Sequence, residues 1–217
     1  MKDLKFAMSY SFGKDSALAM YKMIEAGHEP ICLITAINER DGRSWFHGIS
    51  QNIAEKIADS IGLPIITASS TGAQKYVEAF TNALLQAKTL GAEVCVFGDI
   101  DIEEHLEWNK NVCNAAELEC ITPLWGTSRE TSVKEEIESG ITAVIKVVDH
   151  KYLNDEFLGR ELTTELVDKI RQTGADVCGE NGEYHTLVTY APFYKAPVPI
   201  HLGEIVQIDG YGAIDIL

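Results

Sequence analysis

Two kinds of hydrophobic pattern alternate along the first half of the chain. Short apolar runs between turn residues are typical of buried strands. They cover residues 4–10, 30–37, 63–68, 93–97 and 118–121. Apolar residues three and four positions apart indicate helices between these runs, at about 17–26, 48–61, 76–90 and through 108–116. Strands alternating with helices at this spacing predict a parallel sheet covered by helices on both faces.

The alternation stops near Pro123-Leu124-Trp125-Gly126. Ser132 with Glu135 resembles a capping box and predicts that a helix begins there and ends at Gly140. Further elements are predicted at 142–148, 164–172, 187–190, 204–208 and 211–216. Asp209-Gly210 between the last two is a strong hairpin signal. We therefore expect an α/β protein with two domains, a parallel-sheet domain at 1–125 and a smaller α+β domain at 126–217.

Charge and composition narrow the range of partners. The formal net charge of −15 gives a surface that repels phosphate backbones, so we expect no nucleic-acid partner. An acidic surface that only aids solubility is the alternative. No apolar stretch approaches the 18 residues or so that span a bilayer, and the first residues lack a signal-peptide pattern. We expect a cytoplasmic protein without a membrane partner.

The five cysteines are odd in number and lack Cys-x-x-Cys spacing. They are Cys32, Cys95, Cys113, Cys120 and Cys178. Most lie in apolar runs, which predicts buried reduced thiols rather than a structural zinc site.

Residues 11–16 form a polar loop between a predicted strand and a predicted helix. Such a loop collects free backbone N–H groups and the positive end of a helix dipole, which suits an anion. Gly13 lets the backbone approach a ligand closely, Ser11 and Ser16 add hydroxyl donors, and Lys14 adds a positive charge. The spacing is shorter than that of a Walker loop. An ordinary strand-to-helix turn is the alternative.

Asp99 and Asp101 follow a predicted strand at the edge where parallel sheets bind ligands. Their carboxylates can hold Mg²⁺ against phosphates, or they can cap the next helix. The acidic residues that follow, at 103–107, are interpreted as a solvated helix face rather than a metal site.

A second polar stretch, Gly179-Glu180-Asn181-Gly182-Glu183, lies between short apolar runs and is followed by Tyr184-His185-Thr186. Asn-Gly favours a plain turn. The density of donors and acceptors favours a binding loop instead.

Together these stretches resemble a known family. Ser11-Phe12-Gly13-Lys14-Asp15-Ser16 resembles the PP-loop of the ATP pyrophosphatase superfamily, with Phe12 in place of a Gly, which leaves a side chain beside the phosphates. With Gly98-Asp99-Ile100, Pro123-Leu124-Trp125 and 179–186, nearly the whole chain resembles the diphthine–ammonia ligase family, also called N-type ATP pyrophosphatases. The family's Glu-Gly-Gly-Glu signature reads Glu180-Asn181-Gly182-Glu183 here.

The resemblance implies a HUP-like nucleotide domain and an AMP-forming amide ligase that uses ATP and Mg²⁺. A carboxylate acceptor, in that family diphthine on elongation factor two, is adenylated with release of pyrophosphate, and ammonia then displaces AMP. The residues implied for the nucleotide are Ser9, Ser11, Phe12, Gly13, Lys14, Asp15, Ser16, Gly98 and Asp99, with Asp99 on Mg²⁺. Those implied for the acceptor are Glu180, Asn181, Gly182, Glu183, His185 and Thr186.

We assign catalytic roles to four residues. Lys14 neutralises the leaving pyrophosphate, Asp15 orients the loop or the metal, and Glu180 and Glu183 position ammonia or the acceptor. The expected partners are ATP, ammonia and an acceptor carboxylate, for which a protein side chain is one candidate. A homodimer is a further expectation that the sequence does not decide.

Two alternatives remain open. Phe12 and Asn181 depart from the family pattern, which favours a nucleotide-binding sensor or regulatory protein without ligase turnover. A tRNA-modifying thiolase or lysidine-type enzyme is disfavoured by the acidity and by the lack of paired catalytic cysteines.

Overall fold

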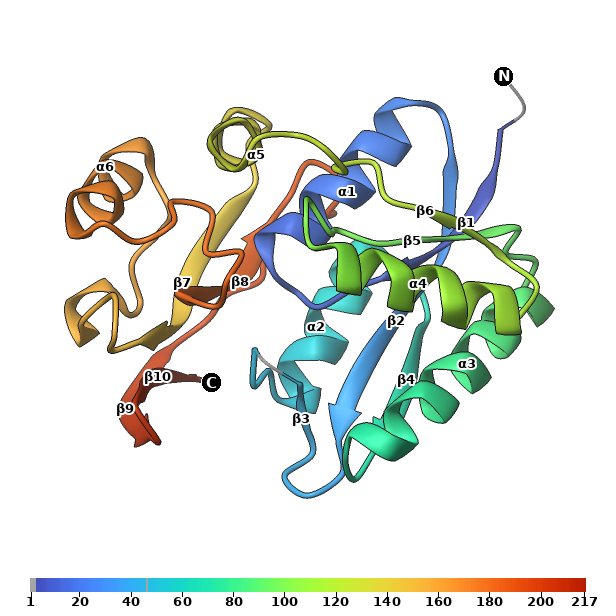
Figure 1. Cartoon of the computed structure of the whole chain (residues 1–217), viewed down its shortest axis with the longest axis horizontal. Helices are drawn as coiled ribbons and strands as arrows, with labels where there is room; N and C mark the ends of the chain where they lie inside the picture. Colours follow the sequence, from blue (N-terminus) through green and yellow to red (C-terminus); the bar gives the residue numbers. More distant parts are fainter. Residues whose placement is uncertain (1–2, 46) are drawn as a thin grey trace.

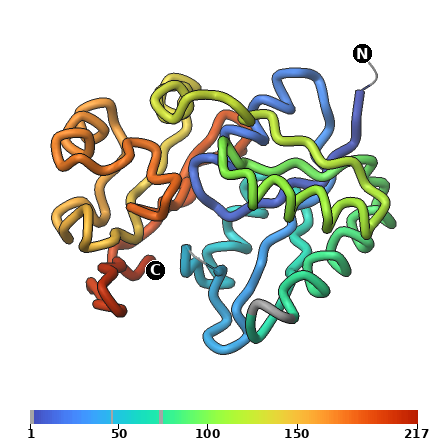
Figure 2. Tube along the Cα trace, viewed as in Figure 1, coloured from blue at the N-terminus to red at the C-terminus, as the bar shows by residue number. Residues whose placement is uncertain are grey.

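The computed structural model describes residues 3–45 and 47–217 and contains two β-sheets, one in each half of the chain (Figure 1 and Figure 2). The first half contains β1 (Lys5–Ser9), α1 (Lys14–Glu25), β2 (Glu29–Asn38), β3 (Arg43–Ser44), α2 (Gln51–Ile61), β4 (Ile65–Ser70), α3 (Ala73–Thr89), β5 (Val94–Val96), α4 (Glu103–Ala115) and β6 (Glu119–Ile121). The second half contains α5 (Arg129–Glu138), β7 (Thr142–Asp149), the 3₁₀-helix η1 (Asp155–Phe157), α6 (Thr164–Thr173), β8 (Tyr184–Tyr190), β9 (Leu202–Ile208) and β10 (Tyr211–Ile216).

The first sheet is parallel apart from its short strand β3. Its hydrogen-bonded order is β3-β2-β1-β5-β6, and β4 also pairs with β2. Successive residues of β1 point to opposite faces. Phe6 and Met8 join the core that includes α1 and α2, whereas Ala7 joins the core that includes α3 and α4. The predicted parallel sheet with helices on both faces is confirmed.

The second sheet is antiparallel, in the order β8-β7-β10-β9. Its core residues, such as Ile145 of β7 and Leu187 of β8, belong to the same hydrophobic cluster as Phe6 and Met20 of the first half. One apolar core therefore joins the two sheets on the α1 side. The boundary between residues 125 and 126 stays a prediction.

The predicted start of α5 is wrong. The helix begins at Arg129, and the side chain of Ser128 caps it by accepting a hydrogen bond from the Thr131 backbone N–H at 3.2 Å. Ser132 is a buried residue of the first turn, and among the described residues its hydroxyl has no partner. The capping-box spacing favoured Ser132, because Glu135 follows it by three positions, whereas Thr131 stands at that place after Ser128. A serine caps a helix without the acidic partner, so the spacing selected the wrong serine.

Two further segments differ from what the sequence predicts. The polar residues 38–44, between the predicted strand at 30–37 and the predicted helix at 48–61, indicate a loop, but Arg43 and Ser44 form β3, which pairs with the end of β2. Residues 184–186 belong to β8, although they read as part of the polar stretch before it. Their polar side chains hid the strand because one end of β8 faces a cavity.

The helices are short, and the longest, α3, has 17 residues. Within residues 3–45 and 47–217, none is long and apolar enough to cross a bilayer. The Asp209-Gly210 hairpin is confirmed between β9 and β10, and both turn residues have positive φ, of 42° and 89°.

Candidate active site

A cavity of about 790 Å³ opens beyond the carboxyl ends of β1 and β5. Its lining comes from the loop that precedes α1, from Gly98 and Asp99 after β5, from α3 and α4, and from residues 178–180 and 184–186 of the second half. This is the edge at which parallel sheets bind ligands. The two polar stretches singled out in the sequence therefore line the same cavity.

The loop at 11–16 is held by short local hydrogen bonds. The Ser16 hydroxyl donates to the Gly13 carbonyl at 2.9 Å, and the Gly13 N–H donates to the Ser11 hydroxyl at 3.3 Å. Gly13 precedes α1 without a side-chain cap, so the N–H groups of the first turn point toward the loop. A Cβ on Gly98 would lie 2.8 Å from the Ser16 backbone nitrogen, so only glycine lets the end of β5 approach this turn. Ser9, Ser11 and Ser16 all line the cavity.

Phe12 does not lie beside the ligand space, contrary to expectation. Its side chain is fully buried and packs edge-on against Tyr10, with ring centroids 5.4 Å apart. Its φ is 69°, in the left-handed region that glycine adopts freely, which explains why the family pattern has Gly there. Strain of this kind costs on the order of 1–3 kcal/mol. The buried ring offsets that cost, because a buried aromatic side chain contributes about 3–5 kcal/mol.

Lys14 is buried beside two carboxyl groups and a thiol at the start of α1. Its Nζ lies 2.5 Å from Asp15 Oδ1, 3.3 Å from Cys178 Sγ and 3.4 Å from Glu136 Oε1. Burial would lower the pKa of Lys14, but its acidic neighbours, foremost the Asp15 carboxylate, outweigh burial and raise it well above its ordinary value. The Lys14 ammonium therefore keeps its charge at physiological pH.

The carboxylates around Lys14 are held in different states. Burial would raise the pKa of Asp15, but Lys14 outweighs it and lowers the pKa below its ordinary value. Burial raises the pKa of Glu136 well above its ordinary value, so its carboxyl takes up a proton more readily than that of Asp15. Glu136 lies on α5, where the neighbouring lysine and glutamates suggest an ordinary solvated face. No pattern around Glu136 indicates that its side chain is buried.

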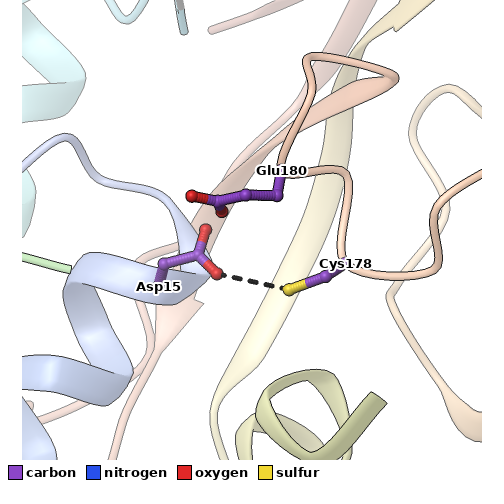
Figure 3. A group of neighbouring side chains, drawn as sticks. All are labelled: Asp15, Cys178 and Glu180. Atoms are coloured by element: carbon purple, nitrogen blue, oxygen red, sulfur yellow. Dashed lines mark hydrogen bonds between the residues drawn. The ribbon is translucent and has the colours of Figure 1, made fainter. Parts of the chain in front are cut away.

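Cys178 and Glu180 face the loop from the second half of the molecule. Figure 3 shows the Asp15 and Glu180 carboxylates directed toward one another, with the Cys178 thiol donating to Asp15 Oδ1 at 3.7 Å. Burial, followed by the nearby Asp15, raises the pKa of Glu180 to about 7. Cys178 is a buried free thiol, as predicted, but its place in the cavity wall was not.

The segment that carries Glu180 is anchored by Asp176. Its carboxylate accepts the N–H groups of Cys178 and Glu180 at 3.0 and 3.2 Å, and Arg129 donates to it at 2.7 Å. Arg129 also pairs with Asp101 at 2.8 Å. Asp101 is therefore used as an anchor and does not line the cavity.

Glu183, Asn181 and Gly182 lie outside the cavity lining. Glu183 is 3% exposed, and its two carboxylate oxygens accept the backbone and side-chain N–H groups of Asn181, both at 3.1 Å. The structure thus gives Glu183 a contact within its own loop rather than with a ligand. Asn181, the departure from the Gly of the family signature, provides that contact.

Two histidines form part of the wall near the loop. The rings of His47 and His185 lie 4.9 Å apart, and His47 Nδ1 is 2.8 Å from the Thr186 carbonyl. Burial lowers the pKa of both, that of His185 to about 3, so both are neutral at pH 7. The Thr186 hydroxyl accepts the Lys14 N–H at 3.1 Å. His47 was missed because it lies in a segment that gave no motif.

Asp99 lines the cavity and caps no helix. Its carboxylate accepts from Asn109 Nδ2 at 2.7 Å and lies 3.2 Å from His105 Nδ1. The residue before α4 is Ile102, and α4 has no side-chain cap, so the capping alternative is wrong for Asp99 and Asp101. Glu103 and Glu104 are exposed, as expected of a solvated face.

The far end of the cavity is aromatic. Tyr76 and Phe80 of α3 and Trp108 of α4 lie against one another, with ring centroids 5.1–6.2 Å apart. Trp45 approaches Tyr76 from the segment after β3 at 6.5 Å. The sequence showed Tyr76 and Phe80 only as an apolar helix face. Their flat apolar surfaces suit a planar ring.

Comparisons with known proteins cover both halves of the chain. The family model described as the diphthamide synthase N-terminal domain matches residues 4–120, and the diphthamide synthase C-terminal domain matches residues 128–216. A diphthine–ammonia ligase from Danio rerio is 25% identical over 226 residues, which cover 90% of this chain and 86% of that protein. A diphthine–ammonia ligase from Homo sapiens is 26% identical over 235 residues, which cover 94% and 85%.

A solved structure described as a predicted subunit of tRNA methyltransferase from Methanocaldococcus jannaschii aligns with a TM-score of 0.47 and 14% identity. The alignment covers 87% of this chain and 97% of that one. A likeness at this level carries no functional argument.

Proposed function

The chain belongs to the diphthamide synthase family, and from this premise we propose that it is an ATP-dependent amide ligase. In the proposed reaction an acceptor carboxylate attacks the α-phosphate of ATP, pyrophosphate leaves, and ammonia displaces AMP to form the amide. The names of the relatives point to diphthine as the acceptor and ammonia as the amine.

One observation carries the proposal. Asp15 of the loop and Cys178 of the second polar stretch are 163 positions apart in sequence, yet they face each other in one cavity (Figure 3). A ligase must bring a nucleotide and an acceptor together, and holding the two in reacting geometry supplies much of the rate enhancement. The meeting of the two stretches is what such a reaction requires.

We assign the phosphates to the loop. The hydroxyls of Ser11 and Ser16 offer donors, as do the N–H groups that follow Lys14 at the start of α1, and the Lys14 side chain supplies a fixed positive charge. Negative charge grows on the leaving pyrophosphate, so a preorganised cation here lowers the barrier. The adenine is assigned to the aromatic end, against the rings of Tyr76 and Trp108.

The end of the cavity beside the loop at 11–16 fits Mg²⁺. Asp15, Asp99 and Glu180 bring three carboxylates to its wall, and Mg²⁺ prefers oxygen ligands. We propose Asp15 and Asp99 as the carboxylates available to it. When bound, the ion would neutralise phosphate charge.

The acceptor and ammonia are assigned to the side of Glu180, His185 and Thr186. Glu180 faces Asp15 and can orient ammonia by hydrogen bonding. Neutral His47 and His185 can accept or donate a hydrogen bond without adding charge. Glu183 and Asn181 are proposed as positioning residues, because they hold the loop and do not reach the cavity.

The sensor alternative loses its support. Phe12 occupies a position inside the core, and Asn181 makes hydrogen bonds within its loop, so neither departure obstructs the cavity. Neither observation favours a protein without turnover.

Product analysis tests the proposal. The protein is incubated with ATP, Mg²⁺, ammonium and a diphthine-bearing acceptor protein, and the nucleotides are separated by chromatography. We expect AMP and pyrophosphate in amounts that match amide formation. ADP with orthophosphate would refute the pyrophosphatase chemistry, and AMP release without amide would refute this acceptor.

A further inference from the structure

We propose that Asp99, His105 and Glu180 hold a divalent transition-metal ion, of the Mn²⁺ or Zn²⁺ class, that binds without nucleotide. This ion is separate from the Mg²⁺ that accompanies ATP. The proposal goes beyond the proposed function, since it concerns the nucleotide-free protein.

The three side chains already have the spacing of a metal site. One ligand atom of each lies within 4.8 Å of the others. His105 Nδ1 is 3.2 Å from Asp99 Oδ1. Metal bonds of about 2.0–2.2 Å at tetrahedral angles place neighbouring ligand atoms about 3.4 Å apart. The Asp99–His105 pair therefore needs little movement to share an ion. Glu180, whose ligand atom lies within 4.8 Å of theirs, must come closer, and its side chain has three torsions with which to do so.

Each ligand comes from a different part of the chain. Asp99 follows β5, His105 lies in the first turn of α4, and Glu180 lies in the segment before β8. An ion at this point would tie that segment to the first half beside the loop. Asn109 donates to Asp99 Oδ2 and leaves Oδ1 directed at His105, which is how neighbouring groups orient a ligating carboxylate.

A second group of possible ligands, Asp15, Cys178 and Glu180, is less suitable. Figure 3 shows these three side chains together. Lys14 Nζ already lies 2.5 Å from Asp15 Oδ1 and 3.3 Å from Cys178 Sγ, so a cation is in place there. Among the described residues, no lysine or arginine forms an ion pair with Asp99 or Glu180. In the described part of the chain, the group with His105 therefore has no lysine or arginine ammonium or guanidinium in the place of the ion.

The chemistry of the ligands selects the ion. An imidazole nitrogen suits Zn²⁺, Mn²⁺ and neighbouring transition metals, whereas Mg²⁺ prefers oxygen and keeps several waters. Glu180 has two carboxylate oxygens, so one can ligate this ion while the other faces the loop. When this ion holds Asp99, Asp15 is the one of the two proposed Mg²⁺ carboxylates that remains for the Mg²⁺ of the nucleotide.

Metal titration of the full chain tests the proposal. Chelator-treated protein is titrated with Mn²⁺, followed by electron paramagnetic resonance, and with Zn²⁺ and Mg²⁺ by calorimetry, all without ATP. We expect one Mn²⁺ or Zn²⁺ per chain and at least tenfold weaker Mg²⁺ binding. His105→Ala should weaken Mn²⁺ and Zn²⁺ at least tenfold, about 1.4 kcal/mol, and His105→Gln should do the same.

Two matched variants separate the possibilities. Glu104→Gln removes an exposed carboxylate from the same turn of α4, and Cys178→Ser removes the thiol of the competing group. Both should leave Mn²⁺ affinity within about twofold. Loss of affinity in Cys178→Ser but not in His105→Ala would overturn the proposal in favour of the other group. Absence of binding, or equal binding by wild type and His105→Ala, would also overturn it.

The result is independent of the ligase assignment. ATP binding with Mg²⁺ and the AMP-forming assay are measured on the same His105→Ala protein. If His105→Ala binds metal normally while AMP and pyrophosphate still form, only the metal proposal fails. If the wild type binds Mn²⁺ as expected but makes ADP, only the ligase proposal fails.

Discussion

Two buried lysines, one in each half of the molecule, show opposite effects of their surroundings. Lys14 and Lys146 are 2% and 4% exposed. Negative neighbours raise the pKa of Lys14 well above its ordinary value despite burial. For Lys146 on β7, burial and then the nearby Arg43 lower the pKa to about 8, and Asp215 offsets only part of this. Burial acts alike on both, so the neighbouring charges decide the direction of each shift.

The opposite pKa shifts mean that the charge of Lys14 is available to bind a ligand, whereas the charge of Lys146 lowers the stability of the folded protein. Lys14 has carboxylates that keep it charged, and phosphates can take over their role when a nucleotide binds. Lys146 contributes no ion pair among the described residues and lies outside the cavity lining. A buried lysine is therefore a candidate ligand group only where its neighbours hold the charge in place at the edge of a cavity.

The largest effect is expected for Lys14→Met. Removing one partner of a buried ion pair leaves the other uncompensated, and such changes cost about 3–5 kcal/mol. ATP binding should be lost, because the fixed charge of the loop is gone. Urea denaturation and ATP titration measure the two effects. Lys22→Met, a change on the same helix at the surface pair with Glu135, should cost less than about 1 kcal/mol and leave ATP binding intact. Unchanged ATP affinity in Lys14→Met would remove the loop from the nucleotide site.

Lys146→Met should stabilise the protein by about 3 kcal/mol at pH 7, from a pKa difference of roughly 2.5 units. The folded state loses the Lys146 proton near pH 8, whereas the unfolded state keeps it to about pH 10.4. The cost of charged Lys146 is therefore full below pH 8 and disappears as pH rises to about 10.4.

Denaturation midpoints from pH 7 to 10 test this dependence. The wild type should gain a stability contribution over that range that Lys146→Met lacks. Lys151→Met changes an exposed lysine of the same half and should keep the wild-type dependence. If Lys146→Met is less stable than the wild type at pH 7, the Lys146 ammonium has a stabilising interaction that outweighs the cost of its burial.

Asp176→Ala should cost about 1–3 kcal/mol, because it removes the acceptor of Arg129 and of two N–H groups. The segment carrying Glu180 would lose its anchor, so ligation should fall at least tenfold while ATP affinity stays within about twofold. Asp101→Ala removes the other partner of Arg129 and should retain ligation. Equal losses in both variants would show that Arg129, rather than the segment, sets the rate.

The smallest effect on stability is expected for Glu183→Gln, about 1 kcal/mol, since the amide keeps the shape and one acceptor for Asn181. ATP affinity should stay nearly intact, while ligation falls because the loop is held less firmly. Parallel ATP titrations and amide assays measure this. A tenfold loss of ATP affinity would assign the loop to the nucleotide site, and no change in either quantity would leave it a plain turn.

Local patterns were enough to predict most of the helices and strands and the loop at 11–16, but not β3 or the start of α5. The alternation of strands and helices follows from the short-range spacing of apolar residues. The loop is likewise local, because Ser11, Gly13 and Ser16 form hydrogen bonds with one another. Asp99 was found for a related reason, because the carboxyl ends of parallel strands share one edge.

Residues that depend on long-range packing were not predicted. His47, Cys178 and Glu136 reach the site through contacts with residues more than a hundred positions away. In the sequence they look like a loop residue, a buried thiol and a solvated helix face. Phe12 was misplaced for the same kind of reason, since its backbone conformation turns the ring into the core.

The hydrogen bonds between β8 and the loop have a mechanical consequence. The Val188 N–H donates to the Phe12 carbonyl at 2.8 Å, and the Thr186 hydroxyl accepts the Lys14 N–H two residues earlier along β8. Hydrogen bonds on both sides of Gly13 thereby hold the loop at 11–16 against the second sheet. A swing of the second sheet would carry the loop with it and leave the distance between them unchanged. Any motion that widens the cavity to admit a large acceptor must therefore come from the opposite wall, where α3 and α4 carry the aromatic rings.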